Sequence, residues 1–354
     1  MTDPPEPPPR WRDPAAVRTA ALAVVAAAAG WWLLKELAPV VRPLLFAVVL
    51  AYVILPYHAR LRTRVSGAAS LALLGGAAAA VLAGLAVAVY ASVLGLAEEL
   101  PVLQKRAVGL IHGADDWARA NAPWAAGPAD DGKQFEERLA AQAVAAAAPV
   151  LAAAAGVLGD AVVVGLYLIF LLLEAAQFPA RVRTAYAPDR ADEILKVAGA
   201  VNAAIVSYLK AKVKASLFAA VPVGLILVCF GVRFALLWAV LTFLCNFIPY
   251  VGSVVAYTLP VGFAFLQLPL GWQPVAVAVL VLGCHLTCAS VVEPMLLGRA
   301  VGLSPLVILG SLAFWGLLWG IPGMFLAVPL TVVAVIVMGH FDATRPVARL
   351  LGGG

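Results

Sequence analysis

The chain has 354 residues, of which 64% are hydrophobic and only 12% are charged, and its mean hydropathy is +0.98. These values exclude a soluble globular protein, since such chains carry roughly 25% charged residues. The formal net charge of +5 does not indicate nucleic-acid binding, because the basic residues stand at the ends of apolar runs, where the positive-inside rule expects them.

Three apolar runs follow a proline-rich start. Residues 1–16 are rich in proline and lack apolar periodicity, so we expect a disordered cytoplasmic tail. Residues 17–95 contain three runs long enough for the roughly 20 residues of a spanning helix, and we predict the first three transmembrane helices there. The loop between the second and third runs is short and carries Arg60, Arg62 and Arg64. Short basic loops stay in the cytoplasm, which places the N-terminus there as well.

Two polar segments separate these helices from the rest of the chain. Residues 96–149 carry more acids than bases and have leucines at rough helical spacing, which predicts an amphipathic extracytoplasmic helical subdomain. Residues 150–173 predict a fourth transmembrane helix. Residues 174–214 carry more bases than acids and predict a cytoplasmic amphipathic helical segment. The tail 342–354 is expected on the cytoplasmic side too.

Two breaks interrupt the apolar core at 215–341. Proline and glycine near 246–252 and 320–323 should end helices, because proline lacks an N–H and glycine tolerates turns. Either two full spans meet at each break, or the halves form re-entrant hairpins. We favour hairpins, because the half from 234 to 247 amounts to only about 21 Å of helix.

These breaks predict a binding site. Non-helical backbone at membrane depth persists where protein buries it or where it lines a watery cavity, and paired broken helices are typical of transporter sites. The alternative is an ordinary proline kink that neighbouring helices repair, and the polar side chain of Asn246 favours the binding site. The predicted substrate- or ion-binding residues of the two breaks are Asn246, Pro249, Tyr250, Gly252, Gly320, Pro322 and Gly323.

Glu293, which follows a long charge-free run, is a further candidate. A carboxylate at mid-membrane depth costs on the order of 3 kcal/mol, so acids kept there tend to mark proton or ion paths. We therefore predict that Glu293 binds the coupling ion; the alternative is a helix-end residue paired with Arg299. Predicted structural hinges surround it or lie further along the chain: Pro294, Gly298, Gly302, Pro305 and Pro329.

The sequence gives no sign of catalysis. Cys284, His285 and Cys288 could place three donors on one helix, but structural zinc takes four ligands, so metal binding is not expected. Zinc-protease, serine-hydrolase and phosphate-loop motifs are absent from the sequence. We expect no enzymatic activity, no cofactor and no nucleic-acid partner.

Three blocks of sequence resemble the autoinducer-2 exporter (AI-2E) family of bacterial transporters. Asn-Phe-Ile-Pro-Tyr-Val-Gly at 246–252 is similar to the family's Ile-Pro-Tyr-Ile-Gly-Pro element, and the other two blocks are 292–305 and 319–329. The chain departs from the family pattern at Ser253, at Pro322 and at Ala211-Lys212, where the family usually has Gly-Gln. The resemblance implies that 215–341 is a transport core in the bacterial inner membrane, with several passes. The basic residues place both termini in the cytoplasm.

The expected fold is all-α: a polytopic integral membrane protein with about 6 to 8 transmembrane segments, two of them broken or re-entrant helical hairpins. The first functional hypothesis is secondary transport or export of a small solute such as autoinducer-2, a quorum-sensing signal. The alternative is a Na+/H+ antiporter of the same family, and further alternatives are an oligomeric passive pore or a membrane scaffold. The expected partners are the lipid bilayer, a small solute or monovalent cation, and further copies of the chain in a homo-oligomer.

Overall fold

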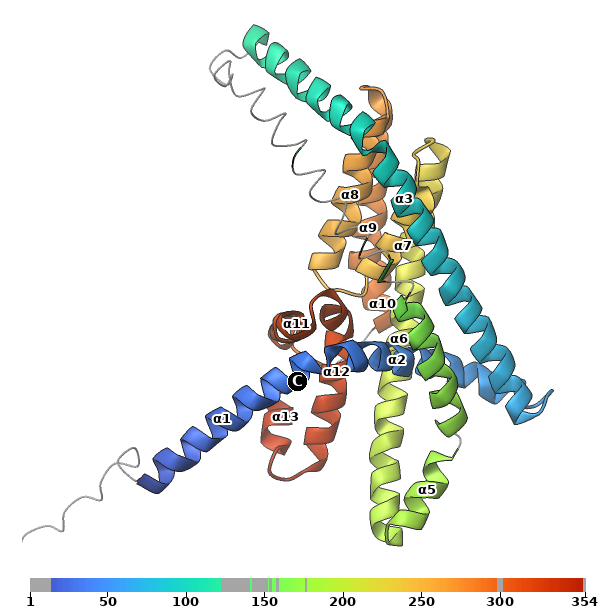
Figure 1. The fold of residues 1–354 in the computed structure, drawn as a ribbon, viewed down its shortest axis with the longest axis vertical. Coiled ribbons are helices and arrows are strands. Elements are labelled where there is room, and N and C mark those ends of the chain that lie inside the picture. The colour runs from blue at the N-terminus through green and yellow to red at the C-terminus, as the bar shows by residue number, and fades with distance from the viewer. Residues whose placement is uncertain are drawn as a thin grey trace, which may run out of the picture.

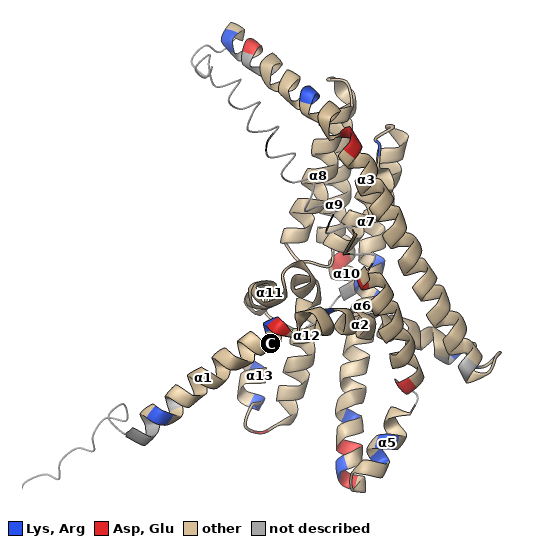
Figure 2. Cartoon of the chain, viewed as in Figure 1, with Lys and Arg blue, Asp and Glu red and all other residues tan. Residues whose placement is uncertain are grey.

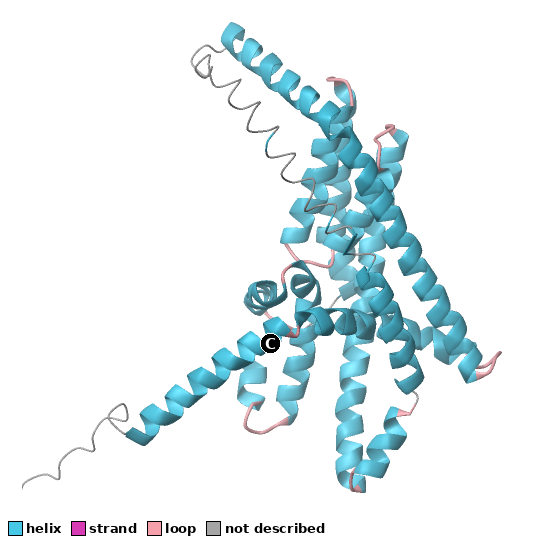
Figure 3. Cartoon of the chain, in the orientation of Figure 1, coloured by secondary structure: helices cyan, strands magenta, loops and turns pink. Residues whose placement is uncertain are grey.

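The computed structural model describes residues 14–121, 159–175, 177–297 and 302–352, with a few isolated positions between 141 and 156. These parts are helical and contain no strand, which confirms the all-α prediction (Figure 3). The helices are α1 Pro14–Glu36, α2 Ala38–Leu61, α3 Gly67–Asn121, an unlabelled helix Gly159–Ala175, α5 Phe178–Ala185, α6 Pro188–Cys229, α7 Ala235–Cys245, α8 Val251–Gln267, α9 Trp272–Thr287, the π-helical turn η3 Cys288–Val292, α10 Glu293–Leu297, α11 Pro305–Trp319, α12 Ile321–His340 and α13 Arg345–Leu351.

Six helices in the described residues are long and apolar enough to cross a membrane, in agreement with the predicted range. They are Val17–Glu36, Ala38–His58, Ala69–Gly113, Pro188–Cys229, Trp272–Leu296 and Ile321–His340. Gly159–Ala175 and Phe178–Ala185, bent by 57° at their junction, make a seventh if the pair is counted as one span. Helices α7, α8 and α11 are apolar but shorter than a span.

The long helix α6 organises the core (Figure 1). Around its upper half lie α7, α8 and α9, and α5 packs against its lower end. On the other side α6 contacts α2 and α12, and α12 pairs closely with α11. Helix α1 is tied to α11 by the indole of Trp319, whose Nε1 donates a 3.0 Å hydrogen bond to the carbonyl of Leu34.

Two helices run through positions where composition changes. Helix α3 continues from Gly67 to Asn121 without ending near residue 96, and at about 1.5 Å per residue it is far longer than the roughly 30 Å of a hydrocarbon core. Helix α6 likewise passes residue 214 without a break. The polar segments predicted on either side of the membrane therefore begin within helices; the domain boundaries themselves stay predictions.

The distribution of side chains is that of a membrane protein. Figure 2 shows that charged residues gather on α5, on the lower end of α6 and on the upper end of α3, while the helices between are almost uncharged. Large apolar side chains such as Val24, Val81 and Leu225 are exposed by 60% or more of their surface. Such surfaces are stable when lipid covers them.

Candidate functional site

The first break forms a hairpin with a strained tip. Helix α7 ends at Cys245 and α8 begins at Val251. Between them the N–H of Val251 donates a 2.7 Å hydrogen bond to the carbonyl of Pro249 across Tyr250, whose φ is 63° and ψ is −62°. This is a γ-turn with positive φ, a rare and strained conformation for a residue that has a side chain. Tyr250 itself is exposed.

Gly252 lets the two halves of this hairpin approach closely. A Cβ at Gly252 would lie 1.7 Å from the carbonyl oxygen of Cys245, so only glycine fits. The second hairpin has a close contact of the same kind: a Cβ at Gly323 would lie 2.0 Å from the carbonyl oxygen of Trp315. At the tip of that hairpin Gly320 adopts φ 69° and ψ −145°, a region open essentially to glycine alone.

The tip of the first hairpin packs against the side of the second hairpin. The rings of Phe247 and Phe325 stack with centroids 4.5 Å apart, and Ile248 packs with Leu312 and Ala327. These contacts are apolar and lie along the side of the second hairpin, four or more residues from its break at Gly320. The hypothesis that the two breaks form one binding site stays a prediction. In the second hairpin Ser311 donates a 3.0 Å hydrogen bond to the carbonyl of Ala327 within the same hairpin.

Polar side chains gather beside the first tip instead. We call Tyr208, Lys212, Ser216, Asn246 and Glu293 the polar cluster. Asn246 is 7% exposed and donates a 3.0 Å hydrogen bond from Nδ2 to Oγ of Ser216, which is fully buried. Lys212 is 2% exposed and its ammonium forms an ion pair with the carboxylate of Glu293, which is 25% exposed.

Helix geometry explains how the cluster assembles. Tyr208, Lys212 and Ser216 are four residues apart on α6 and therefore share one face. Glu293 follows the π-helical turn η3, a local widening that recurs at functional sites. Within that turn the thiol of Cys288 donates a 3.4 Å hydrogen bond to the carbonyl of Ala215, which fixes η3 against α6.

Several buried polar atoms near the cluster have no hydrogen-bond partner among the described residues. They are the hydroxyl of Tyr208, Oγ1 of Thr242 one turn before Asn246, and Nε2 of His285 one turn before Cys288. Unpaired polar atoms inside a protein each cost roughly 1–3 kcal/mol, so they mark places where a further hydrogen-bonding group would be stabilised. No group of three metal-ligating side chains occurs in the described part of the chain.

The other predicted residues have structural positions. Pro305 begins α11, where Ser304 caps the helix by accepting a 3.3 Å hydrogen bond from the N–H of Val307. Gly302 has a φ of 54°, which favours glycine. Pro294 lies in α10, Pro322 is in the first turn of α12 and Pro329 is buried within α12. Gly298 and Arg299 lie outside the described residues.

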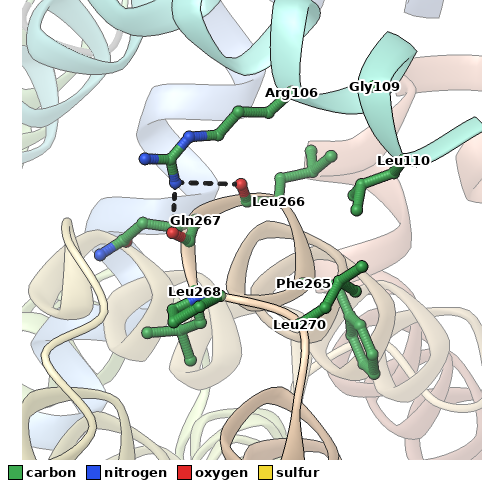
Figure 4. A pocket seen from close by; sticks show the side chains of 9 residues that line it. Arg106, Gly109, Leu110, Phe265, Leu266, Gln267, Leu268 and Leu270 are labelled. Carbon is green, nitrogen blue, oxygen red and sulfur yellow. Dashed lines mark hydrogen bonds between the residues drawn. The ribbon is translucent and has the colours of Figure 1, made fainter. Parts of the chain in front are cut away.

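A separate pocket of about 410 Å³ lies at the far end of α8 (Figure 4). Arg106 of α3 reaches over it and donates hydrogen bonds to the carbonyls of Leu266 and Gln267. The side chain of Gln267 in turn accepts a 2.7 Å hydrogen bond from the N–H of Arg233, which pairs with Glu99. This network joins α3 to the bundle; it lies apart from the polar cluster, which adjoins the opposite end of α8.

An all-α chain with several spans, two hairpins that meet and a buried ion pair beside them is typical of membrane transporters. The chain belongs to the AI-2E family of transporters, whose sequence profile matches residues 21–343. A Haemophilus influenzae protein named "Putative transport protein" is 36% identical over 200 residues, which are 56% of this chain and 57% of that protein. The "AI-2 transport protein TqsA" of Escherichia coli is 32% identical over 186 residues, 52% of this chain and 53% of its own length. The chain thus spans a little over half the length of these relatives.

Proposed function

We propose that this chain is a secondary transporter of the bacterial inner membrane, and that the polar cluster binds its cargo or its coupling ion. The observation that carries the proposal is the buried ion pair of Lys212 and Glu293, which joins α6 to α10 one turn from Ser216, the partner of Asn246. Taking an ion out of water costs several kcal/mol, so a charged pair that is kept buried calls for a function.

The hairpin tip supplies the neighbouring binding groups. Asn246 follows the last residue of α7 and donates one N–H of its side-chain amide to Ser216, and the amide oxygen remains an acceptor for a hydroxylated solute or a cation. The unpaired hydroxyl of Tyr208 adds a donor one turn away from Lys212 on the same face of α6.

The two hairpins supply the moving part. They are joined by the Phe247–Phe325 stack, and the tip of the first one holds Tyr250 in a strained γ-turn. Strain stored at such a tip favours a second conformation in which the turn relaxes, and rigid movement of one repeat against the rest is how such transporters alternate access. A shift of the tip would move Asn246 relative to Ser216 and so open or close the cluster.

The relative named for autoinducer-2 transport favours that solute as cargo. A Na+/H+ exchange reaction is the alternative, because Glu293 is a carboxylate at the site. We further propose that the chain forms a homo-oligomer and takes part in quorum sensing.

The test is flux through proteoliposomes that hold the purified chain, with autoinducer-2 inside and an imposed pH or Na+ gradient. We expect efflux that follows a gradient and that Asn246→Ala reduces at least tenfold. The matched control is Thr258→Ala on the exposed face of α8, which should transport as the unchanged chain does. Ion exchange without autoinducer-2 flux would establish the antiporter alternative, flux independent of any gradient would establish a pore, and no flux of solute or ion would refute transport.

A further inference from the structure

The charges of the polar cluster balance each other. Lys212 brings one positive charge and Glu293 one negative charge, and the two form an ion pair although 81 positions separate them in the sequence. Cys288, on the η3 turn that precedes Glu293, donates a hydrogen bond to the carbonyl of Ala215 on α6 and so holds the two helices together. The carboxylate is therefore already compensated by a group of the chain itself.

Lys212 is buried, unlike the two lysines nearest to it in the sequence. Lys210 and Lys214 stand two residues away on either side and are exposed, whereas Lys212 is 2% exposed on the opposite face of the same helix. One turn to either side of it lie the hydroxyls of Tyr208 and Ser216. Oxygen atoms of hydroxyls, amides and carboxylates are the ligands that hard cations take in proteins.

We propose that Lys212 is a tethered cation, which occupies the position at Glu293 that a free monovalent cation would otherwise take. This inference rests on the proposed function, since it concerns the coupling ion of the same site. A Na+ ion beside the carboxylate would have to lie next to a buried ammonium, and like charges a few ångströms apart repel strongly away from water. The site of this chain therefore works without Na+, and Lys212 determines that specificity.

The proposal predicts that a neutral side chain at 212 creates a Na+ site. In Lys212→Gln the carboxylate of Glu293 loses its partner. The oxygens of Tyr208 and Ser216, one turn to either side of position 212, and that of Asn246, which is bonded to Ser216, remain. We expect Lys212→Gln to bind Na+ at least tenfold more tightly than the unchanged chain does.

The experiment measures saturable 22Na+ binding to the purified full chain in detergent, together with its thermal unfolding in NaCl and in choline chloride at equal ionic strength. The unchanged chain should show no saturable binding and the same midpoint in both salts. Lys212→Gln should bind 22Na+ and melt at a higher temperature in NaCl. Lys212→Gln combined with Glu293→Gln should lose both effects, and Lys214→Gln is the matched control that should behave as the unchanged chain.

Saturable Na+ binding by the unchanged chain would overturn the proposal, and so would a folded Lys212→Gln that binds none. A Lys212→Gln chain that folds only in NaCl would support it. One that folds in neither salt, while the doubly neutral chain folds, would overturn it, because Na+ then cannot replace the ammonium. The binding test needs no transport, so a chain that binds as expected and moves no solute would refute the proposed function alone.

Discussion

Replacing Gly252 by alanine should disrupt the first hairpin. The added Cβ would lie 1.7 Å from the carbonyl oxygen of Cys245, whereas ordinary contacts are 3.4–4 Å, so α8 would have to move away from the end of α7 by well over an ångström. The obstacle is backbone and cannot rotate aside. Overpacking of this kind costs about 1–3 kcal/mol even where side chains can adjust, and we expect at least the upper value here.

The assay is thermal unfolding of the purified chain in detergent, followed by tryptophan fluorescence. Gly262→Ala is the matched control: it lies in the same helix, and a Cβ there would meet nothing within 4 Å. Because alanine is the better helix former, the control should gain about 0.5–1 kcal/mol. Equal stabilities of Gly252→Ala and Gly262→Ala would refute the close approach of the two helices.

Three further changes test the hairpin tips and the ion pair. Tyr250→Gly should raise the unfolding midpoint, since a γ-turn with positive φ costs about 1–3 kcal/mol for a residue with a side chain; an unchanged or lower midpoint would contradict the strain. Phe247→Ala should destabilise the chain by about 3–5 kcal/mol. Because the two rings stack, Phe325→Ala should cost much less in a chain that already carries Phe247→Ala than it does alone. Additive losses of stability would contradict the contact. Glu293→Gln should cost about 3–5 kcal/mol by leaving the ammonium of Lys212 unpaired, and replacing both residues by glutamine should restore most of that loss in the same unfolding assay.

The two helix breaks could be predicted from the sequence, whereas the polar cluster could be predicted only in part. Pro249 and Gly320 end helices for reasons local to the backbone, so the sequence shows them directly. The strained residue of the first tip was not predictable. Glycine is the residue that tolerates a positive φ, whereas the structure places the positive φ at Tyr250 and uses Gly252 for a close contact.

Lys212 was missed as a site residue. Its neighbours Lys210 and Lys214 give the segment the pattern of a solvated basic stretch, and sequence alone does not say which face of α6 meets the bundle. For Glu293 the sequence offered a partner close in the chain, Arg299, whereas the partner seen in the structure comes from a helix far away in the sequence. The departure at Ala211-Lys212 was the one available signal, since a buried lysine needs a partner.

The shortness of α7 has a consequence for how the protein is made. Its 11 residues amount to about 16 Å of helix, roughly half the hydrocarbon thickness, so a nascent chain that ends after α7 has no stable position across the bilayer. We therefore expect α7 and α8 to enter the membrane together, as one hairpin whose two backbones are in close contact at Gly252. On this expectation the region is inserted only after both helices and the tip between them have been synthesised.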